Sequence, residues 1–257
     1  WVLTAAHVVE TLIANETGVF LGVDVGMEHF DDVYTVSEIH IHPAWEGESE
    51  FMESGVDIAL VKLNQPIDTE MVSIASWANQ SAANVLELGS TIYTAGYGVY
   101  DLGYSECSDF CLDDGDGEYS QRRAWANTLD RIVDNIVPPH EFPGDDQLRG
   151  GFIVYDFDSP SEEHNSLVSG KTSTLQQGSY SYAGSGNSEP TPLEMEGTSV
   201  QGDSGGPTYA FLAGSWTVIG LTAHGSATAN YGDVAFNTYV AIHADWICSF
   251  DSQSSPI

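Results

Sequence analysis

Gly202-Asp203-Ser204-Gly205-Gly206-Pro207 is the most informative stretch of this 257-residue chain. Its glycines favour a tight turn, because glycine adopts backbone conformations that other residues avoid. Such a turn can direct backbone N–H groups at one point beside the serine hydroxyl. The N–H groups of Gly202 and Ser204 are therefore candidates for an oxyanion hole. The alternative interpretation of this stretch is an ordinary glycine-rich turn between two strands.

Two further motifs favour the catalytic interpretation. Thr4-Ala5-Ala6-His7 stands near the start of the chain, and Val56-Asp57-Ile58-Ala59-Leu60 lies between it and Ser204. A serine hydroxyl becomes a good nucleophile when a base takes its proton and a third group orients that base. The sequence therefore predicts Ser204 as nucleophile, His7 as general base and Asp57 as its orienting partner. Taken singly, His7 could be a core histidine and Asp57 a cap at a strand entry.

The order His, Asp, Ser and the flanks of the three motifs resemble the chymotrypsin/trypsin-like (S1-type) serine peptidases. Ile39-His40-Ile41-His42-Pro43, Ala95-Gly96-Tyr97-Gly98 and the closing segment Tyr239–Ile247 extend the resemblance over most of the chain. Residues 99 to about 190 fit it poorly. The resemblance implies an all-β fold of two six-stranded antiparallel β-barrels with a C-terminal helix and an active site in the cleft between the barrels.

The local pattern agrees with this architecture. Short runs rich in Val, Ile, Tyr and Thr are separated by Gly, Asn and Asp, as expected for strands and turns. These runs are Gly18–Val25, Asp57–Leu63, Thr91–Gly96 and Thr217–Thr222. Helical spacing of apolar residues predicts a helix over Tyr239–Phe250 and a weaker one over Ala124–Ile136.

We expect residues 1–85 to hold the remainder of the N-terminal barrel and residues 86–257 the C-terminal barrel. Long loop insertions are expected at about 99–120 and 138–192. Family members begin well before the histidine strand, with an amine that reaches the aspartate beside the nucleophile, here Asp203. Because this chain opens at Trp1, we interpret it as a fragment whose first barrel is incomplete.

The resemblance also predicts substrate-binding residues. Trypsins of the family carry an aspartate six residues before the nucleophile, where it binds Arg or Lys, and the matching residue here is Thr198. An uncharged substrate side chain is therefore expected, although Asp233 could still reach the pocket wall. Ala223, His224 and Gly225 stand where the family pairs with extended substrate backbone.

The charge of the chain limits its partners. It has 38 acidic and 6 basic residues, a formal net charge of −32. Nucleic acid and anionic membranes are excluded as partners, because both require clustered Lys and Arg. Self-repulsion of this size destabilises the compact state. High salt, bound cations or positively charged partners would offset it, so we expect a saline or cation-rich extracellular setting, and the family implies secretion.

One acidic loop is a candidate calcium site, since calcium prefers several oxygen ligands close together. Its ligands would be Asp113, Asp114, Asp116 and Glu118. The loop lacks the spacing of an EF-hand, and a solvated acidic loop is the alternative. His40 and His42 share one strand face, but the family places a histidine there without metal. No cofactor is expected for the chemistry itself.

The chain has three cysteines, Cys107, Cys111 and Cys248. The first two could form a disulfide across a short loop, which would leave Cys248 unpaired or paired elsewhere. Three free thiols are the alternative.

The predicted function is that of a secreted, monomeric serine endopeptidase that cleaves polypeptide substrates through an acyl-enzyme intermediate. One alternative is a catalytically silent homologue that uses the same fold as a binding module. Another is an esterase, which would share the triad and differ in substrate.

Overall fold

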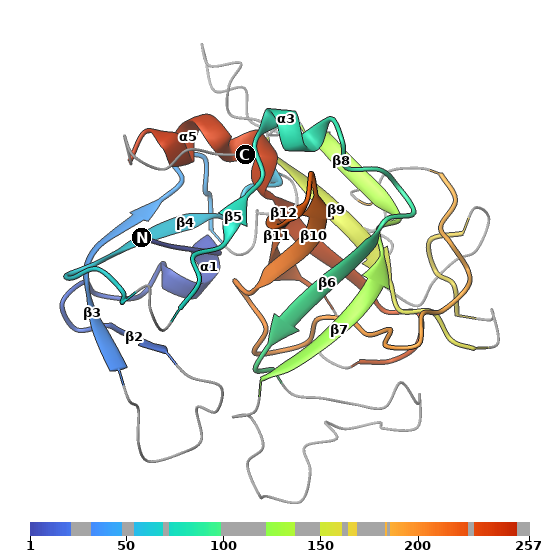
Figure 1. Cartoon of the computed structure of the whole chain (residues 1–257), viewed down its shortest axis with the longest axis horizontal. Helices are drawn as coiled ribbons and strands as arrows, with labels where there is room; N and C mark the ends of the chain where they lie inside the picture. The colour runs from blue at the N-terminus through green and yellow to red at the C-terminus, as the bar shows by residue number, and fades with distance from the viewer. Residues whose placement is uncertain are drawn as a thin grey trace, which may run out of the picture.

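The computed structural model describes residues 1–21, 32–47, 54–68, 72–98, 122–136, 150–160, 164–168, 183, 186–225 and 229–250. Two curled sheets lie side by side, the first at the blue N-terminal end of the chain and the second in green to red (Figure 1). Among the described residues, no helix is both long and apolar enough to cross a membrane.

The first sheet has four strands in the order β1-β4-β3-β2, all antiparallel. They are β1 (Val2–Thr4), β2 (Gly18–Leu21), β3 (Asp32–Ile41) and β4 (Ala59–Leu63). The short helix α1 (Ala6–Val9) follows β1 directly and buries Ala6 and Val9 against this sheet. His7 therefore lies on a helical turn that is held in place by the burial of Ala6 and Val9.

The second sheet has the order β7-β6-β10-β11-β12-β9-β8, and the short strand β5 (Ser76–Trp77) pairs with β11 in parallel. Its other strands are β6 (Thr91–Gly96), β7 (Arg123–Thr128), β8 (Arg131–Ile136), β9 (Gly150–Asp156), β10 (Pro207–Leu212), β11 (Ser215–His224) and β12 (Val234–Tyr239). In the described part of the chain, further short helices are α3 (Gln80–Ala83), the 3₁₀-helix η2 (Val240–His243) and α5 (Ala244–Cys248).

The predicted all-β architecture with a short C-terminal helix is confirmed. The described strands divide four and eight between the sheets, not six and six. β5 lies before residue 85 and yet pairs with the second sheet. The domain boundary at residues 85 and 86 stays a prediction.

The helix predicted over Ala124–Ile136 is wrong. These residues form β7 and β8, and β7 pairs with β6 along its whole length, while β8 pairs with β9. As strands, the two segments pair with β6 and β9. This pairing buries more of their backbone and side chains than a helix on the surface would. Sheet context therefore outweighs the weak helical spacing.

One apolar cluster joins the two halves. It contains Leu60 of β4 and Ile58 just before that strand, Val218 and Leu221 from the second sheet, and Ile247 from α5. A buried hydrogen bond adds to it, since Thr238 Oγ1 donates to the carbonyl oxygen of Asp57 at 2.9 Å. The segment that carries Asp57 is thus held by both halves.

Two buried histidines lie under the C-terminal helix. The ring centres of His42 and His243 are 5.0 Å apart, and His42 also contacts Trp246 of α5. Burial lowers the pKa of His42 to about 4, and burial together with the nearby His42 lowers the pKa of His243 to about 3. Both imidazoles are therefore neutral in the folded protein near neutral pH.

This pair predicts acid sensitivity. A histidine whose pKa is depressed on folding contributes stability above its unfolded pKa near 6.5, and loses it as the pH falls toward the folded value. For His42 alone the loss is about 3 kcal/mol by pH 4. We expect the free energy of urea unfolding to fall steeply between pH 6.5 and 4. His243→Phe should flatten this slope, whereas the exposed-site control His164→Gln should not; an equal slope in His243→Phe would contradict the assignment.

Candidate active site

Two polar contacts fix His7 against Asp57. The backbone N–H of His7 donates to Asp57 Oδ1 at 3.0 Å, and His7 Nδ1 lies 2.6 Å from Asp57 Oδ2. The Asp57 carboxylate is fully buried, and the His7 side chain is 15% exposed. A carboxylate at this position holds the proton on Nδ1, so Nε2 is left as the basic nitrogen.

The turn around Ser204 is shaped by two glycines with positive φ, +99° at Gly202 and +74° at Gly205. Gly205 N donates to the carbonyl of Thr222 at 2.8 Å, and Thr222 N donates to Gly206 at 2.9 Å. These bonds tie the turn to β11. Ser204 itself is exposed to solvent.

The turn lies directly against the segment that carries His7. A Cβ atom added at Gly205 would overlap the Thr4 hydroxyl and lie 3.1 Å from Ala5 N and 3.3 Å from Val8 Cγ2. Residues 4, 5 and 8 flank His7, and Gly205 follows Ser204. The fold thus brings the predicted nucleophile, base and orienting carboxylate into one neighbourhood from three separate parts of the chain.

This close approach makes Gly205 a sensitive position. Gly205→Ala would have to adopt positive φ and displace the Thr4 side chain, so we expect the turn to shift relative to His7. A shift of about 1 Å can cost roughly 10²-fold in rate. The measurement is kcat/KM on a peptide substrate, beside Gly214→Ala, whose added Cβ would meet nothing within 4 Å although its φ is also positive at +89°. Equal activity of the two variants would contradict the prediction.

The candidate oxyanion donors make no hydrogen bond to the described protein. Within the described part of the chain, the N–H groups of Gly202 and Ser204 donate to no protein acceptor. The intervening Asp203 is engaged instead, since Asp203 N donates to the carbonyl of Val200 at 3.1 Å. Two free amides on an exposed turn are available for an incoming oxyanion.

The predicted substrate-binding residues also converge. A Cβ atom added at Gly225 would lie 3.1 Å from the carbonyl oxygen of Ser199, so the segment after Thr198 runs beside the end of β11. Ala223 is buried, whereas His224 and Gly225 are partly exposed. Thr198 is buried, and its hydroxyl has no hydrogen-bond partner among the described residues.

Asp233 has a structural task of its own. Its carboxylate accepts a hydrogen bond from Asn230 N at 2.8 Å, within the turn that precedes β12. This hydrogen bond explains the presence of an aspartate at position 233 without a role in substrate binding.

Behind the turn lies a pocket that the sequence did not predict. It has a volume of about 190 Å³, and Arg123, Glu196, Thr198 and Asp203 are among its lining residues. The Asp203 carboxylate accepts hydrogen bonds from Gly98 N at 2.8 Å and Val200 N at 3.0 Å. Burial raises the pKa of Asp203, and burial raises the pKa of Glu196 to about 6.

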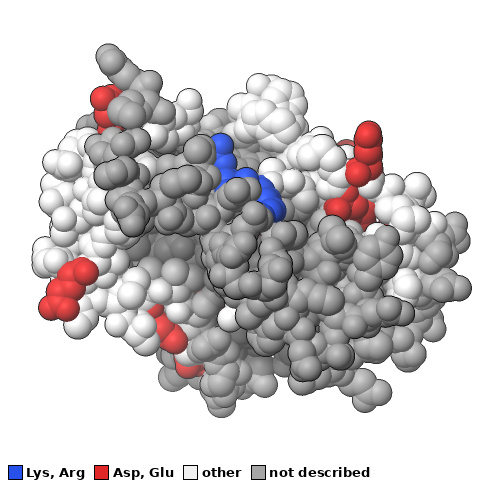
Figure 2. Space-filling view, turned by 90° about the horizontal axis from the view of Figure 1, so that it is seen from below, with Lys and Arg blue, Asp and Glu red and all other residues white. Residues whose placement is uncertain are grey.

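Arg123 is the nearby positive charge that favours the ionised form of Asp203. On the face shown in Figure 2, the described Lys and Arg side chains form one band near the centre, and Asp and Glu lie apart from it. The proximity of Arg123 to the buried Asp203 carboxylate can be recognised only in the folded structure.

The candidate calcium ligands Asp113, Asp114, Asp116 and Glu118 lie outside the described residues, as do Cys107 and Cys111. Among the residues that the structure describes, no group of three or more His, Cys, Asp or Glu could hold a metal ion. His40 Nε2 lies 2.9 Å from Glu38 Oε2, which accounts for one of the paired histidines. Cys248 is free. Calcium binding stays a prediction.

Comparisons with known proteins bear on the same features. The family model described as Trypsin matches residues 1–108, which include His7 and Asp57 but not Ser204. Tryptase of Mus musculus is 24% identical over 252 residues, which are 96% of this chain and 73% of tryptase. Vitamin K-dependent protein C of Mus musculus is 24% identical over 254 residues, which are 97% of this chain and 44% of that protein.

The fold is similar to that of a solved structure. The secreted serine protease VesC from Vibrio cholerae matches with a TM-score of 0.54 and 18% identity, over 98% of this chain and 40% of that chain. The chain therefore spans less than half the length of protein C and of VesC.

Two curled, mostly antiparallel sheets with a histidine–aspartate pair and a serine turn between them define a chymotrypsin-like fold. The chain is similar to chymotrypsin/trypsin-like (S1) serine peptidases, in sequence to tryptase and protein C and in fold to VesC. These similarities support a peptidase function in general terms.

Proposed function

We propose that the protein is an extracellular serine endopeptidase in which His7, Asp57 and Ser204 form the catalytic triad. The observation that carries the proposal is the double contact of His7 with the buried Asp57, at 3.0 and 2.6 Å, beside a turn that packs on the His7 segment. A buried carboxylate costs free energy unless it is paired. The buried Asp57 carboxylate has such a partner in His7, which becomes positively charged during the reaction.

The reaction follows from these positions. Ser204 Oγ attacks the scissile carbonyl carbon while its proton passes to His7 Nε2, and Asp57 stabilises the resulting imidazolium. The N–H groups of Gly202 and Ser204 donate to the developing oxyanion. His7 then gives the proton to the leaving amine, which departs and leaves an acyl-enzyme. Water, deprotonated by His7, releases the acyl group and restores Ser204.

Thr198, Ala223, His224 and Gly225 form the proposed substrate-binding edge. Thr198 stands where trypsins carry the aspartate that binds Arg or Lys, and Asp233 is bound within its own turn. We therefore expect cleavage after uncharged side chains. In the family an amine reaches the aspartate beside the nucleophile, and the pocket at Asp203 is where such a positive charge would be accommodated.

The test is digestion of a library of end-blocked peptides, with cleavage sites mapped by mass spectrometry. Cleavage of internal bonds after uncharged residues, absent from Ser204→Ala protein, is the expected result. Hydrolysis of small esters without any peptide cleavage would replace the endopeptidase by an esterase. Folded protein without turnover of peptides or esters would favour the catalytically silent binding homologue.

A further inference from the structure

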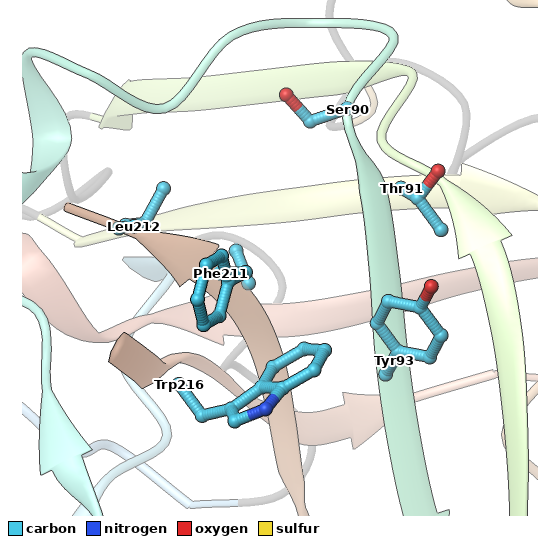
Figure 3. A pocket seen from close by; sticks show the side chains of 7 residues that line it. Ser90, Thr91, Tyr93, Phe211, Leu212 and Trp216 are labelled. Atoms are coloured by element: carbon cyan, nitrogen blue, oxygen red, sulfur yellow. The ribbon is translucent and has the colours of Figure 1, made fainter. Parts of the chain in front are cut away.

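An aromatic groove opens on the second sheet, away from the triad. It has a volume of about 460 Å³ and lies where β6 and β10 separate (Figure 3). These strands pair only at Thr208–Thr94 and Tyr209–Tyr93. Beyond Tyr209 the strand β10 continues to Leu212 while pairing with β11 alone. In both strands, therefore, the backbone that faces the groove is not paired with the other strand.

Three aromatic side chains line this opening. The ring of Trp216 lies 5.1 Å from Tyr93 at right angles, and 5.3 Å from Phe211 at 65°. The exposed fractions are 40% for Tyr93, 59% for Phe211 and 51% for Trp216. Rings held by one another in this way lose little further conformational freedom on binding. Exposed aromatic clusters of this kind mark binding surfaces.

The chemistry of the groove selects its occupant. Among the described residues that line the groove, none is Asp, Glu, Lys or Arg; they are Ser90, Thr91, Tyr93, Ala210, Phe211, Leu212 and Trp216. The chain around it carries a formal net charge of −32. Such a field attracts cations and repels anions over long range. At short range, the faces of Trp, Tyr and Phe attract ammonium and guanidinium groups without requiring a carboxylate.

The uncovered strand edges add a second requirement. Backbone N–H and C=O groups at the edge of a sheet pair readily with an added extended segment. A folded ligand without free backbone would use the rings but not the edges. We propose that the groove binds an extended, positively charged polypeptide segment, with its backbone along β6 or β10 and Lys or Arg side chains over the rings of Tyr93, Phe211 and Trp216.

The groove is separate from the proposed catalytic residues. β10 begins three residues after Ser204, and Phe211 lies seven residues after it. Trp216 lies near the start of β11 and His224 at its end, so the two residues are roughly 26 Å apart along the extended strand. A segment bound in the groove therefore lies beyond the substrate-binding edge at Gly225, and its binding does not depend on catalysis.

The experiment uses the full chain with Ser204→Ala, so that no cleavage can consume the probe. The probe is a fluorescein-labelled dodecapeptide of alternating Lys and Val, which favours an extended backbone. Its anisotropy is followed at 150 mM and 500 mM salt. Matched peptides carry Glu or Ser in place of Lys. We expect saturable binding of the Lys peptide at both salt concentrations, and no binding of the Glu peptide.

Groove variants locate the binding. Trp216→Ala and Phe211→Ala should each weaken the Lys peptide by about 10-fold. Trp216→Phe keeps a ring and should retain most of the affinity. Phe20→Ser is the matched control, because Phe20 is 47% exposed on β2, outside the groove. Circular dichroism and thermal unfolding establish that each variant is folded.

Two results would overturn the proposal. If the Ala variants bind the Lys peptide like Phe20→Ser, or if binding disappears at 500 mM salt in every variant, the attraction is diffuse surface charge. If a neutral glucose oligomer binds and is lost in Trp216→Ala, while the Lys peptide is not, the groove is a carbohydrate site.

Discussion

Ser204→Ala should lower kcat for peptide hydrolysis by about 10⁶-fold, because the triad acts as a unit and removal of its nucleophile removes the covalent route. KM should change little, since the substrate-binding edge at Ala223–Gly225 is untouched. Ser204 is exposed on a turn held by backbone hydrogen bonds, so the variant should keep its fold. Initial rates on an internally quenched peptide measure the effect.

Ser81→Ala is the matched control, because Ser81 is an exposed serine on α3. It should retain full activity. A Ser204→Ala protein that hydrolyses the peptide at more than a few per cent of the unmodified rate would show that another group attacks the carbonyl.

Asp57→Asn should lower kcat by about 10⁴-fold with the backbone in place. Both carboxylate oxygens of Asp57 accept hydrogen bonds from His7, one from the backbone N–H and one from Nδ1. An amide has a single acceptor oxygen, so one of these contacts is lost. If the amide nitrogen faces Nδ1, the ring adopts the other tautomer and Nε2 can no longer take the Ser204 proton.

The measurement pairs kcat with the free energy of unfolding, which separates a chemical effect from a structural one. Loss of one buried hydrogen bond should cost about 1–3 kcal/mol. Asp245→Asn, an exposed aspartate in the first turn of α5, is the control and should change neither quantity. If the variant loses activity only because part of it is unfolded, and the folded fraction has a normal kcat, the role of Asp57 is contradicted.

The sequence predicted those parts of the fold that depend on local patterns. Alternation and turn residues located β6, and its bounds Thr91–Gly96 are the predicted ones. The motifs at His7, Asp57 and Ser204 indicated which residues should meet, and the fold brings their segments together. The predicted helix at Ala124–Ile136 failed because sheet pairing with distant strands, invisible in a local window, decides the conformation there.

The contacts that hold the segments between β8 and β10 could not be predicted from the sequence, for a different reason. The described parts of these segments are held by buried polar groups with no periodic spacing. Asp156 accepts from Leu167 N at 2.9 Å, and Asp130 accepts from Glu189 N at 3.1 Å. Burial and the neighbouring Asp156 raise the pKa of Asp130, and burial raises the pKa of Asp156. Arg131 donates to the carbonyl of Gly186 at 2.7 Å.

The pocket at Asp203 and the aromatic groove were equally hidden. Arg123 and Glu196 are 73 residues apart (196 − 123) and line one pocket. Tyr93 and Trp216 are 123 residues apart (216 − 93) and share one ring contact. Neither separation leaves a trace in composition or spacing, because only the order of strands in the second sheet brings these residues together.

Labelling with a fluorophosphonate probe tests the central claim most directly, since the probe reacts with an activated serine and not with an ordinary one. We predict one probe per chain, located on the peptide that contains Ser204, and no labelling of Ser204→Ala or Asp57→Asn protein. Absence of labelling in folded protein supplied with calcium and salt, or attachment to a different serine, would contradict the proposed triad.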